Sequence, residues 1–502
     1  MPAREAANEA MRQGSTKGAI ASGHELTAKA GLFALREGGT AVDAAIAAAW
    51  MACVVEPVLA SPGGGGFAMV TEGEAEPRLC DFFAQTPRRQ RAGADFRAIE
   101  ADFGTTCQTF HIGHGSTAAP GFVPGLFALH AAHGRLPMAR LIAPAAATAR
   151  RGHVVNAFQA SLARIIAPIL THSPSARALF APGGAFLHAG ETFRNPGLAR
   201  FLELLADGGL AAYENEAVPA MVADQAAGGH LGEEDFAAYE VIWRRPLRGR
   251  VGRAEVWLNP PPAASGVMIA LALLALEEAG ADGACASCRW ARALDAADRA
   301  RRAAGHDPHA LLARLGPPAS RGTTHISAMD AGGGACALTI SNGEGNGHVV
   351  PGFGFMLNNM LGEEDVNPAG EEGWPRDVRM SSMMAPTLAR APGAGLFALG
   401  SGGSNRIRSV IFLVLQRLLA QGFAPEGAVS APRLHVEGGH LDFEPGFSRA
   451  EAAALAAAFP DHRAWPERSM FFGGCHVVSR SEDGTLAAVG DERRAGIGLM
   501  AE

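Results

Sequence analysis

The chain has 502 residues, of which 48% are hydrophobic and 19% are charged, and its formal net charge is −7. These proportions are ordinary for globular proteins and argue against a chain that is disordered throughout. No run of Lys or Arg stands out, which argues against nucleic acid as a partner, because such binding relies on basic residues clustered against phosphates. The length allows one large domain or up to about three.

The first 24 residues mix Arg, Glu and Asn with small residues and contain no apolar core, so we expect no signal peptide. Two apolar stretches, residues 44–55 and 267–276, fall short of the about 20 residues that a membrane span needs, and they predict buried helices. The seven cysteines are odd in number and sparse, which predicts reduced thiols. We therefore expect a cytoplasmic protein with no membrane partner.

Cys285 and Cys288 have the Cys-x-x-Cys spacing that occurs in zinc and redox sites. A zinc site needs two further ligands at matched spacing, and a redox motif needs a strand before it and a helix after it. Neither context is visible around this pair. We expect incidental cysteines at the flank of a helix, and no metal or other cofactor.

The first third of the chain predicts helices around a glycine-rich connection. Thr40 is placed as a helix N-cap with Asp43 at the third helical position, where a carboxylate stabilises the helix N-terminus. The run Gly63–Gly66 is followed by strand-like residues instead of the Lys-Ser/Thr of a phosphate-binding loop, so phosphate binding is disfavoured. The elements expected here are helices at residues 26–37, 40–55 and 136–150, a strand at 67–70, a helix after the turn at 119–125, and a helix from 267.

The pattern changes near residue 320, after a Pro/Gly-rich loop at 316–322. Residues 323–329 and 335–341 alternate with period two around a short glycine turn, which predicts a β-hairpin. Helices and strands mix without a strict βαβ rhythm, so we expect an α+β fold with layered αββα architecture, and we find no internal repeat. Further elements are expected as strands at 396–399, 435–443, 474–479 and 486–489 and a helix at 408–421.

The junction between Gly322 and Thr323 is the most informative point of the sequence. A bent loop here would let the Thr323 hydroxyl attack the Gly322 carbonyl, and water would then cleave the resulting ester. Cleavage would free the α-amino group of Thr323, with a pKa of roughly 7.7–8.0 in model compounds. An amine of this kind beside a hydroxyl is a nucleophile with its own base.

Residues 323–330 followed by 337–341 resemble the first strand pair of the small subunit of the γ-glutamyltransferase family. Several other segments agree with the family in the same order, so that the resemblance spans roughly residues 23–494, nearly the whole chain. It implies a four-layer αββα sandwich of the N-terminal-nucleophile hydrolase type. The supporting segments are residues 39–45, 62–67, 119–125, 260–266, 357–360, 381–383, 400–404, 431–435 and 490–493.

The resemblance implies a role for each matching residue. Thr323 would be the nucleophile and, with Gly322, the cleavage point, giving a large subunit of residues 1–322 and a small subunit of 323–502. Ser341 falls where the family usually has a Thr that steadies the nucleophile. Gly402 and Gly403 would offer backbone N–H groups to the oxyanion, and such donors are worth about 2.7–4 kcal/mol each. The substrate-binding positions implied are Asn342, Asn359, Glu363, Ser381 and Ser382.

This chain departs from the family at the expected carboxylate-binding arginine, whose position is taken by Phe83. A phenyl ring cannot replace the charge-assisted hydrogen bonds of a guanidinium, and Arg88 or Arg89 is the substitute that the sequence offers. The acidic residue for the substrate α-amino group aligns with Glu363, which keeps the carboxylate on a longer stem. Gly322 stands where Asn or Asp is frequent. His325 and His435 are expected to be hydrogen-bonded structural histidines.

Three functions stay open. The first is a self-processing hydrolase or transferase of γ-glutamyl compounds. The second, which Phe83 favours somewhat, is an amidohydrolase of another small acidic amide, such as oxamate, or of an acyl side chain. The third is an uncleaved, non-catalytic homologue that serves as a binding or structural protein, against which the presence of Thr323, Ser341 and the pair Gly402-Gly403 argues. The expected partners are the small-molecule substrate and the two subunits of one precursor, with a homodimer of heterodimers as an open alternative.

Overall fold

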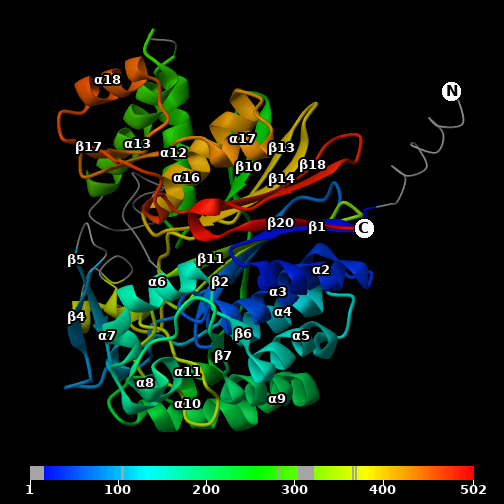
Figure 1. Cartoon of the computed structure of the whole chain (residues 1–502), viewed down its shortest axis with the longest axis vertical. Helices are drawn as coiled ribbons and strands as arrows, with labels where there is room; N and C mark the ends of the chain where they lie inside the picture. The colour runs from blue at the N-terminus through cyan, green and yellow to red at the C-terminus, as the bar shows by residue number, and fades with distance from the viewer. Residues whose placement is uncertain (1–15, 103–106, 281–282, 304–321, 364–366, 368–369) are drawn as a thin grey trace, which may run out of the picture.

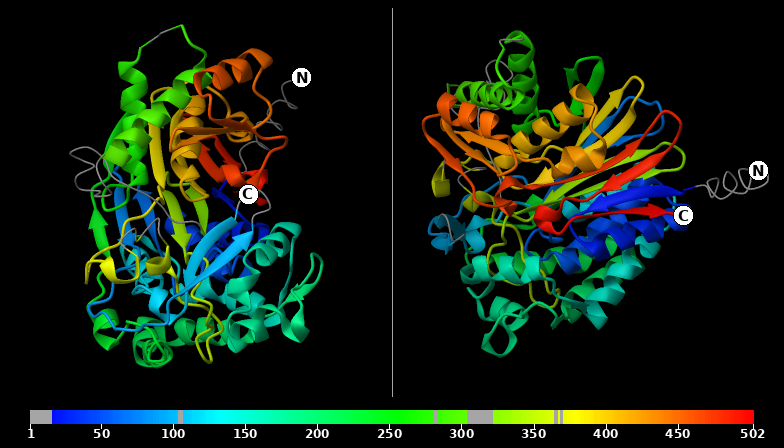
Figure 2. Two further views of the ribbon diagram at one scale, coloured as in Figure 1. Left: turned by 90° about the vertical axis from the view of Figure 1, so that its left-hand side faces the viewer. Right: turned by 45° about the horizontal axis from the view of Figure 1, so that its top comes forward.

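The computed structural model describes residues 16–102, 107–280, 283–303, 322–363, 367 and 370–502. Within this part of the chain, two antiparallel sheets face each other between two layers of helices (Figure 1). Two further views show the helical layers on opposite sides of the paired sheets (Figure 2). The architecture is the α+β, four-layer αββα sandwich expected from the sequence. Of the loop at residues 316–322, in which cleavage is expected, residues 316–321 lie outside the described part of the chain and Gly322 lies within it.

The first sheet contains both strands of the expected hairpin at its centre. The two strands of this hairpin pair antiparallel, from Thr323 opposite Ser341 at one end to Met329 opposite Ala335 at the other. Among the described residues its strand order is β20 (Ile497–Ala501), β1 (Gly18–Ser22), β11 (Thr323–Asp330), β12 (Ala335–Ser341), β2 (Gly65–Thr71), β3 (Arg78–Phe82) and β8 (Ile242–Arg244).

The second sheet packs on the first and is likewise antiparallel. Its central strand β14 carries Gly402 as its last residue, so the sheet ends at the same place as the start of β11. Among the described residues its strand order is β19 (Leu486–Val489), β18 (Gly474–Arg480), β14 (Gly395–Gly402), β13 (Thr387–Ala391), β10 (Ala254–Leu258) and β9 (Leu247–Val251).

The helices outside the first sheet enclose the largest apolar core. The helix α3 is buried at all 15 positions, as expected for a helix that is apolar all round. Its N-terminus has the predicted cap: Thr40 accepts from the Asp43 N–H and Asp43 accepts from the Thr40 N–H at 2.9 Å. The helices of this layer are α2 (Glu25–Arg36), α3 (Ala41–Val55), α4 (Phe122–His133), α5 (Met138–Arg151) and α9 (Pro196–Ala212).

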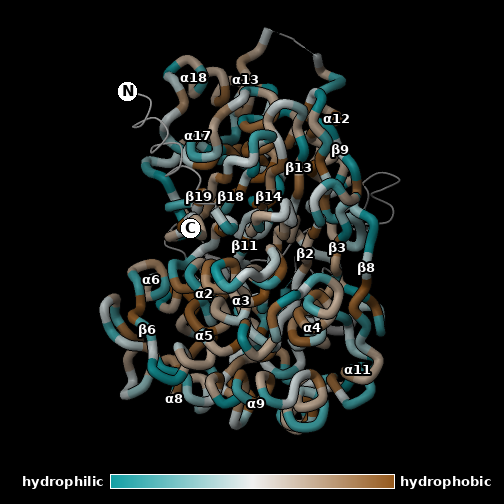
Figure 3. The backbone as a smooth tube through the Cα atoms, turned by 90° about the vertical axis from the view of Figure 1, so that its right-hand side faces the viewer, coloured by the Kyte–Doolittle hydropathy of each residue, from teal (hydrophilic) through white to brown (hydrophobic). Residues whose placement is uncertain are grey.

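The helices outside the second sheet form the opposite layer, as seen in Figure 3, where α12 and α13 lie across the strands from α2 and α3. The expected burial of α12 is correct only for its first half, because Leu274 is 48% exposed and the charged end of the helix faces solvent. Cys288 lies in the first turn of α13 with Cys285 just before it. This layer comprises α12 (Ser265–Glu278), α13 (Ala286–Ala303), α16 (Arg406–Leu415), α17 (Pro425–Ser430) and α18 (Arg449–Ala458).

Two later predictions need correction. Residues 435–443 form a hairpin of two strands, because Gly438 and Gly439 have φ values of 63° and 85° that no continuous strand accommodates. The helix expected at 408–421 begins at Arg406, and its last turn, Gln416–Ala420, is a π-helix.

The six cysteines whose side chains are described are free thiols. No helix in the described residues is both long and apolar enough to traverse a lipid bilayer.

The remaining elements are short and lie outside the two large sheets. The peripheral strands are β4 (Arg97–Asp102), β5 (Cys107–Ile112), β6 (His153–Val154), β7 (Thr192–Phe193), β15 (Leu434–Glu437), β16 (His440–Phe443) and β17 (His462–Ala464). The short helices are α6 (Ala157–Ile165), α7 (Ala167–Leu170), α8 (Pro174–Phe180), α10 (Val218–Gln225), α11 (Glu233–Ala237) and α15 (Gly370–Gly373), with single turns at His114–Ser116, Pro182–Gly184, Tyr213–Ala217, Met360–Gly362, Met470–Phe472 and Glu492–Arg494.

Candidate active site

Thr323 is the first residue of the central strand β11 and is only 1% exposed. Its β-branched side chain suits the start of a strand. The Thr323 hydroxyl is buried and has no hydrogen-bond partner among the described residues. A buried hydroxyl without a hydrogen-bond partner is uncommon and costs free energy of folding. Such a group indicates a functional role, because it does not stabilise the fold.

The peptide before Thr323 is held by the neighbouring strand. The Ser341 hydroxyl donates a hydrogen bond to the carbonyl oxygen of Gly322. The same hydroxyl oxygen accepts from the backbone N–H of Gly343 at 3.1 Å, which orients its proton toward Gly322. A donor on a carbonyl oxygen withdraws electrons from the carbonyl carbon and stabilises the negative charge that develops when a nucleophile adds to it.

Two glycines make this close packing feasible. A Cβ atom at Gly322 would lie 1.8 Å from the carbonyl oxygen of Gly343. Gly343 has φ of 60°, and a Cβ there would lie 2.1 Å from Asn359 Oδ1 and 2.2 Å from Glu363 Oε1. Any larger residue at either position would separate the loop after β12 from the Gly322 peptide.

The end of β14 approaches Thr323 from the second sheet. A Cβ at Gly402 would lie 2.2 Å from the Thr323 carbonyl oxygen, so the two backbones are in direct contact. The chain then turns sharply, with φ of 126° at Gly403 and 58° at Ser404. A non-glycine residue with positive φ is strained, and such strain concentrates at functional sites. This turn brings the backbone of the predicted oxyanion-binding glycines to the nucleophile.

Arg494 is a site residue that the sequence comparison did not single out. Its guanidinium lies against the glycine turn, 3.2 Å from the Cβ position of Gly402 and 3.4 Å from that of Gly403. Burial lowers its pKa to about 10, so it stays charged at neutral pH. Its Nη2 donates to the Met470 carbonyl oxygen at 3.3 Å. The Arg493-Arg494 pair after Asp491 was the only signal in the sequence.

A second unpredicted residue, Glu56, fixes the start of β11. Its carboxylate accepts from the hydroxyl of Thr27 at 2.7 Å and from that of Thr324 at 2.8 Å. Burial raises the pKa of Glu56, and the two hydroxyl donors oppose that rise. The network ties helix α3 to the residue that follows Thr323.

The predicted substrate-binding residues fall into two groups. Asn359 and Glu363 contact the Gly343 turn, and Asn342 lies between Ser341 and that turn. The Asn359 side chain accepts from the N–H groups of Glu344 and Gly345 at 2.9 and 3.2 Å, so it shapes the loop. The Asn342 Oδ1 atom is buried without a hydrogen-bond partner among the described residues.

The serine pair belongs to a separate segment before β13. Ser382 is fully buried; its hydroxyl accepts from the Met384 N–H at 3.1 Å and its carbonyl accepts from the Ala264 N–H at 2.9 Å. The hydroxyl of Ser381 has no hydrogen-bond partner among the described residues. The bonds of Ser382 thus run to the loop before α12 and to its own segment, and they do not join it to the Thr323 cluster.

The position of the missing arginine is occupied by a core residue. Phe83 is fully buried between the sheets and stacks on Phe67 with ring centroids 5.4 Å apart. The two proposed substitutes have exposed partners elsewhere: Arg88 pairs with Asp377 at 3.3 Å and Arg89 with Glu234 at 2.9 Å. Neither guanidinium is held beside Phe83 in this arrangement.

An apolar cavity opens beside the Gly322 peptide. Val58 forms part of its wall, and the Val58 carbonyl oxygen lies 3.4 Å from the Cβ position of Gly322. Glu56, His24 and His153 also line the cavity. The rest of the lining is mainly apolar and includes Leu59, Phe158, Leu162, Phe180, Phe186 and Phe193.

The two histidines expected to be structural are hydrogen-bonded and buried. His325 contacts the hydroxyls of Thr339 at 2.8 Å and Ser327 at 2.9 Å, and burial lowers its pKa. His435 contacts the Ser409 hydroxyl at 2.8 Å. These contacts confirm that both rings are hydrogen-bonded, and none of them is made to Thr323.

The fold and this geometry define the class of protein. N-terminal-nucleophile hydrolases have this αββα sandwich, with a central strand that begins at a buried hydroxyl residue. The chain belongs to the gamma-glutamyltranspeptidase family, whose model matches residues 27–310 and 288–501. The resemblance identified in the sequence is thereby confirmed, as is the assignment of the chain to amidohydrolases and acyltransferases of this type.

Relatives with both acylase and hydrolase names cover most of the chain. The Acylase ACY 1 proenzyme of Pseudomonas sp. (strain SE83) is 29% identical over 512 residues, 94% of this chain and 91% of that protein. The Glutathione hydrolase proenzyme of Escherichia coli (strain K12) is 26% identical over 486 residues, 86% of this chain and 83% of that protein. Both relatives are described as proenzymes.

The fold is also shared with a solved structure of the same class. The crystal structure of cephalosporin acylase from Bacillus halodurans superposes with a TM-score of 0.82 over 97% of this chain and 96% of that chain, at 23% sequence identity. At this identity the similarity establishes the fold.

Proposed function

We propose that this protein is a self-processing amidohydrolase in which Thr323 is first the agent of cleavage and then the catalytic nucleophile. The observation that carries the proposal is the Ser341 hydrogen bond to the Gly322 carbonyl beside an unpartnered Thr323 hydroxyl. In the first step the Thr323 oxygen forms a bond to the Gly322 carbonyl carbon, the peptide C–N bond breaks, and the nitrogen takes a proton. Water then hydrolyses the ester and yields subunits of residues 1–322 and 323–502.

The processed enzyme would use the same groups on its substrate. The freed α-amino group of Thr323 accepts the hydroxyl proton as the oxygen attacks an amide carbonyl, and α-amino groups suit this role because their pKa in model compounds is roughly 7.7–8.0. The N–H groups of Gly402 and Gly403 are the proposed donors to the oxyanion, since the glycine turn touches the Thr323 backbone. The acyl-enzyme is released by water or by an amine acceptor.

The leading substrate class is γ-glutamyl amides. Glu363 supports this choice, because its carboxylate lies against the Gly343 turn, close to the Ser341–Gly322 contact. A carboxylate there would pair with the α-amino group of a γ-glutamyl donor. Relatives named glutathione hydrolase are consistent with the choice.

A second substrate class is favoured by Phe83 and the apolar cavity. Arg88 and Arg89 pair elsewhere, and the guanidinium that does contact Phe83, that of Arg379, is already bound to Asp81 and the Tyr239 hydroxyl. Among the described residues, the donor's α-carboxylate therefore has no uncommitted guanidinium at the position of Phe83. An acyl group without that carboxylate, such as an apolar acyl chain, would avoid this loss and could extend toward the cavity beside Val58. Relatives named acylase agree with this alternative.

The processing step is tested by intact mass. Purified wild-type protein should show two fragments separated between Gly322 and Thr323, the Thr323→Ala variant a single chain, and Thr323→Ser the two fragments again. A single uncut mass for the wild type after long incubation would overturn the proposal and favour the non-catalytic alternative.

The substrate class is tested with four p-nitroanilides on the processed enzyme. The γ-glutamyl compound has both amine and carboxylate, the glutaryl compound lacks the amine, the 4-aminobutanoyl compound lacks the carboxylate, and the hexanoyl compound lacks both. Highest kcat/KM for the γ-glutamyl compound, reduced by Glu363→Gln, supports the leading class. Highest kcat/KM for the hexanoyl compound supports the second and sinks the first.

A further inference from the structure

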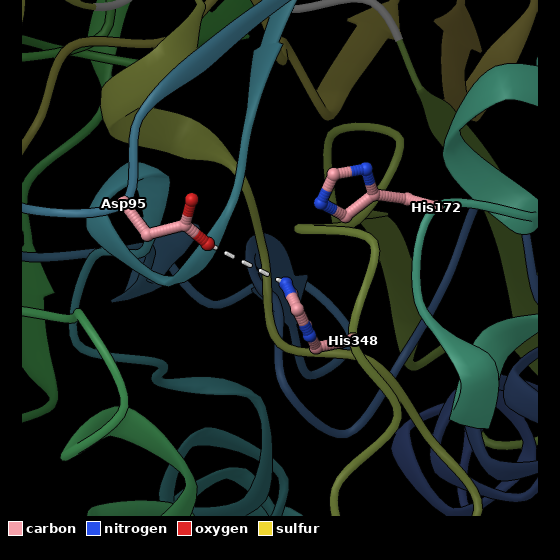
Figure 4. A group of neighbouring side chains, drawn as sticks. All are labelled: Asp95, His172 and His348. Carbon is pink, nitrogen blue, oxygen red and sulfur yellow. Dashed lines mark ion pairs between the residues drawn. The ribbon is translucent and has the colours of Figure 1, made fainter.

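A cluster of metal-ligating side chains lies outside the residues gathered around Thr323. Asp95, His172 and His348 point toward one another, and each offers a ligand atom within 4.8 Å of the others (Figure 4). The His348 Nε2 and Asp95 Oδ2 atoms are 3.6 Å apart. The three residues come from different segments: before β4, between α7 and α8, and after β12.

The surroundings of this cluster are built of further rings and carboxylates. The His114 ring stacks on that of His348, with centroids 3.8 Å apart. His114 lies between two carboxylates, with Nδ1 3.6 Å from Asp95 Oδ2 and Nε2 3.4 Å from Asp224 Oδ2. Carboxylates and histidine rings thus surround the cluster, and carboxylates beside metal-binding histidines are the usual outer partners of such sites.

Three buried polar atoms in and beside the cluster lack hydrogen bonds. The Nε2 atoms of His348 and His114 and the Oδ2 atom of Asp224 are buried, and none makes a hydrogen bond within the described residues. The His114 side chain is only 6% exposed. Their nearest polar neighbours, at 3.4 and 3.6 Å, are too far for good hydrogen bonds. Of these atoms, His348 Nε2 faces Asp95 Oδ2 at the cluster, and a buried nitrogen without a hydrogen bond needs a further partner there.

We propose that Asp95, His172 and His348 bind one divalent cation of the zinc class. Zinc takes nitrogen and carboxylate ligands at about 2.0–2.1 Å in tetrahedral geometry, which places ligand atoms roughly 3.3 Å apart. The 3.6 Å between His348 and Asp95 needs only a small contraction. Arg97 donates to the other oxygen of Asp95 at 2.7 Å, while Oδ2 accepts only a long hydrogen bond from the His114 N–H at 3.4 Å and keeps a lone pair for the cation. The fourth position falls to water.

The cation would fasten the loop that carries the substrate-binding positions. His348 lies in the segment that follows Ser341 and Asn342, and the backbone of Gly347 packs on His172, whose Cβ is 3.0 Å from the Gly347 Cβ position. Asn346 already ties this loop to its surroundings, since its carbonyl accepts from the Gly113 N–H at 2.9 Å. A bond from the metal to His348 adds a second attachment, five residues beyond the Gly343 turn.

The experiment is titration of chelator-treated full-length protein with Co²⁺ and Zn²⁺. We expect one equivalent per chain, a visible Co²⁺ absorption of tetrahedral type, and a higher Tm with Zn²⁺, because a ligand that binds only the folded state stabilises it. His348→Ala and Asp95→Asn should each weaken binding at least 10-fold. The matched control is His188→Ala, whose side chain is 69% exposed and pairs with Glu191 at the surface; it should bind as the wild type does.

Several outcomes would overturn the proposal. These are absence of saturable one-to-one binding, equal loss in the His188→Ala control, and loss on Cys285→Ser, which would place the metal at the cysteine pair. If His348→Ala does not fold, the half-buried His172 provides the decisive variant, His172→Ala, because its ring sits at the edge of the cluster. Wild-type affinity in folded His172→Ala would equally exclude the site.

Discussion

The hydroxyl of Ser341 donates to the carbonyl oxygen of Gly322, and Gly343 donates in turn to that hydroxyl at 3.1 Å. In the proposed cleavage reaction Ser341 would therefore act on the electrophile, the Gly322 carbonyl, whereas the family resemblance suggested support of the nucleophile. Ser341 could serve both roles one after the other, first on the Gly322 carbonyl and then on the nucleophile. It pairs with Thr323 across the hairpin and would remain beside it after Gly322 has been cleaved off.

Replacing Ser341 by Ala should slow self-cleavage. The loss of one donor to a developing oxyanion costs roughly 10²–10³ in rate. Ser341→Thr should retain cleavage within a few-fold, because it keeps the hydroxyl. The measurement is the fraction of intact chain over time after purification, followed by mass spectrometry. Cleavage of Ser341→Ala at the wild-type rate would show that the hydrogen bond has no part in the reaction.

Replacing Gly322 by Ala should also impair cleavage, for a steric reason. The added methyl would lie 1.8 Å from the Gly343 carbonyl oxygen, so the loop after β12 must shift and the Ser341 contact with it. We expect at least a 10-fold slower appearance of the two subunits. Gly249→Ala is the matched control, since the nearest atom to its new methyl is 3.4 Å away. Equal cleavage of both variants would mean that the Gly322 peptide is not held as described.

The hairpin that starts at Thr323 was predictable because its signal is local. Alternating residues on either side of a glycine turn specify both strands and nearly fix the pairing of Thr323 with Ser341. The cap formed by Thr40 and Asp43 is local in the same way, since the two residues are three positions apart. The layered fold followed from many such segments together with the family resemblance.

The partners of the site residues were not predictable, because they are distant in the chain. Glu56 binds the Thr324 hydroxyl although the two residues are 268 positions apart in the chain, and no pattern in the sequence around Glu56 predicts a buried carboxylate. Arg494 lies in the short turn Glu492–Arg494 and meets Gly402 only because the chain folds that turn against the end of β14. The cluster of Asp95, His172 and His348 likewise has no spacing typical of metal ligands, and arises only when three loops converge.

Replacing Glu56 by Gln should destabilise the protein. The carboxylate accepts from two hydroxyls, whereas the amide offers one acceptor and one donor group, so one hydroxyl must reverse and accept from the amide, and the hydrogen bonds lose the strength given by the charge. We expect the free energy of unfolding to fall by about 1–3 kcal/mol. Urea unfolding in the uncleaved Thr323→Ala background measures this on a single chain. Glu37→Gln, at a surface pair with Arg140, is the control and should change little; equal effects would contradict the prediction.

The stability of the protein should fall in mild acid because of buried histidines. Burial lowers the pKa of His24 and of His153 to about 4 in the folded protein, against about 6.5 in the unfolded chain. Between these values the unfolded chain binds more protons, so stability is present above pH 6.5 and is lost as the pH falls toward 4. Each histidine contributes at most about 1.4 kcal/mol per pH unit in that window. In addition, His24 Nδ1 accepts from the Leu26 N–H at 3.1 Å as the cap of α2, which requires the neutral ring.

His24→Asn isolates this contribution, because Asn caps helices and does not titrate. Urea midpoints at pH 7.5, 6.5, 5.5 and 4.5 should fall less steeply for the variant than for the wild type, while the other ionisable groups cancel in the comparison. His188→Asn, at an exposed position, should follow the wild type. Parallel curves for His24→Asn and wild type would mean that His24 binds its proton in the folded state as readily as in the unfolded chain, and that the cap of α2 does not depend on its neutral form.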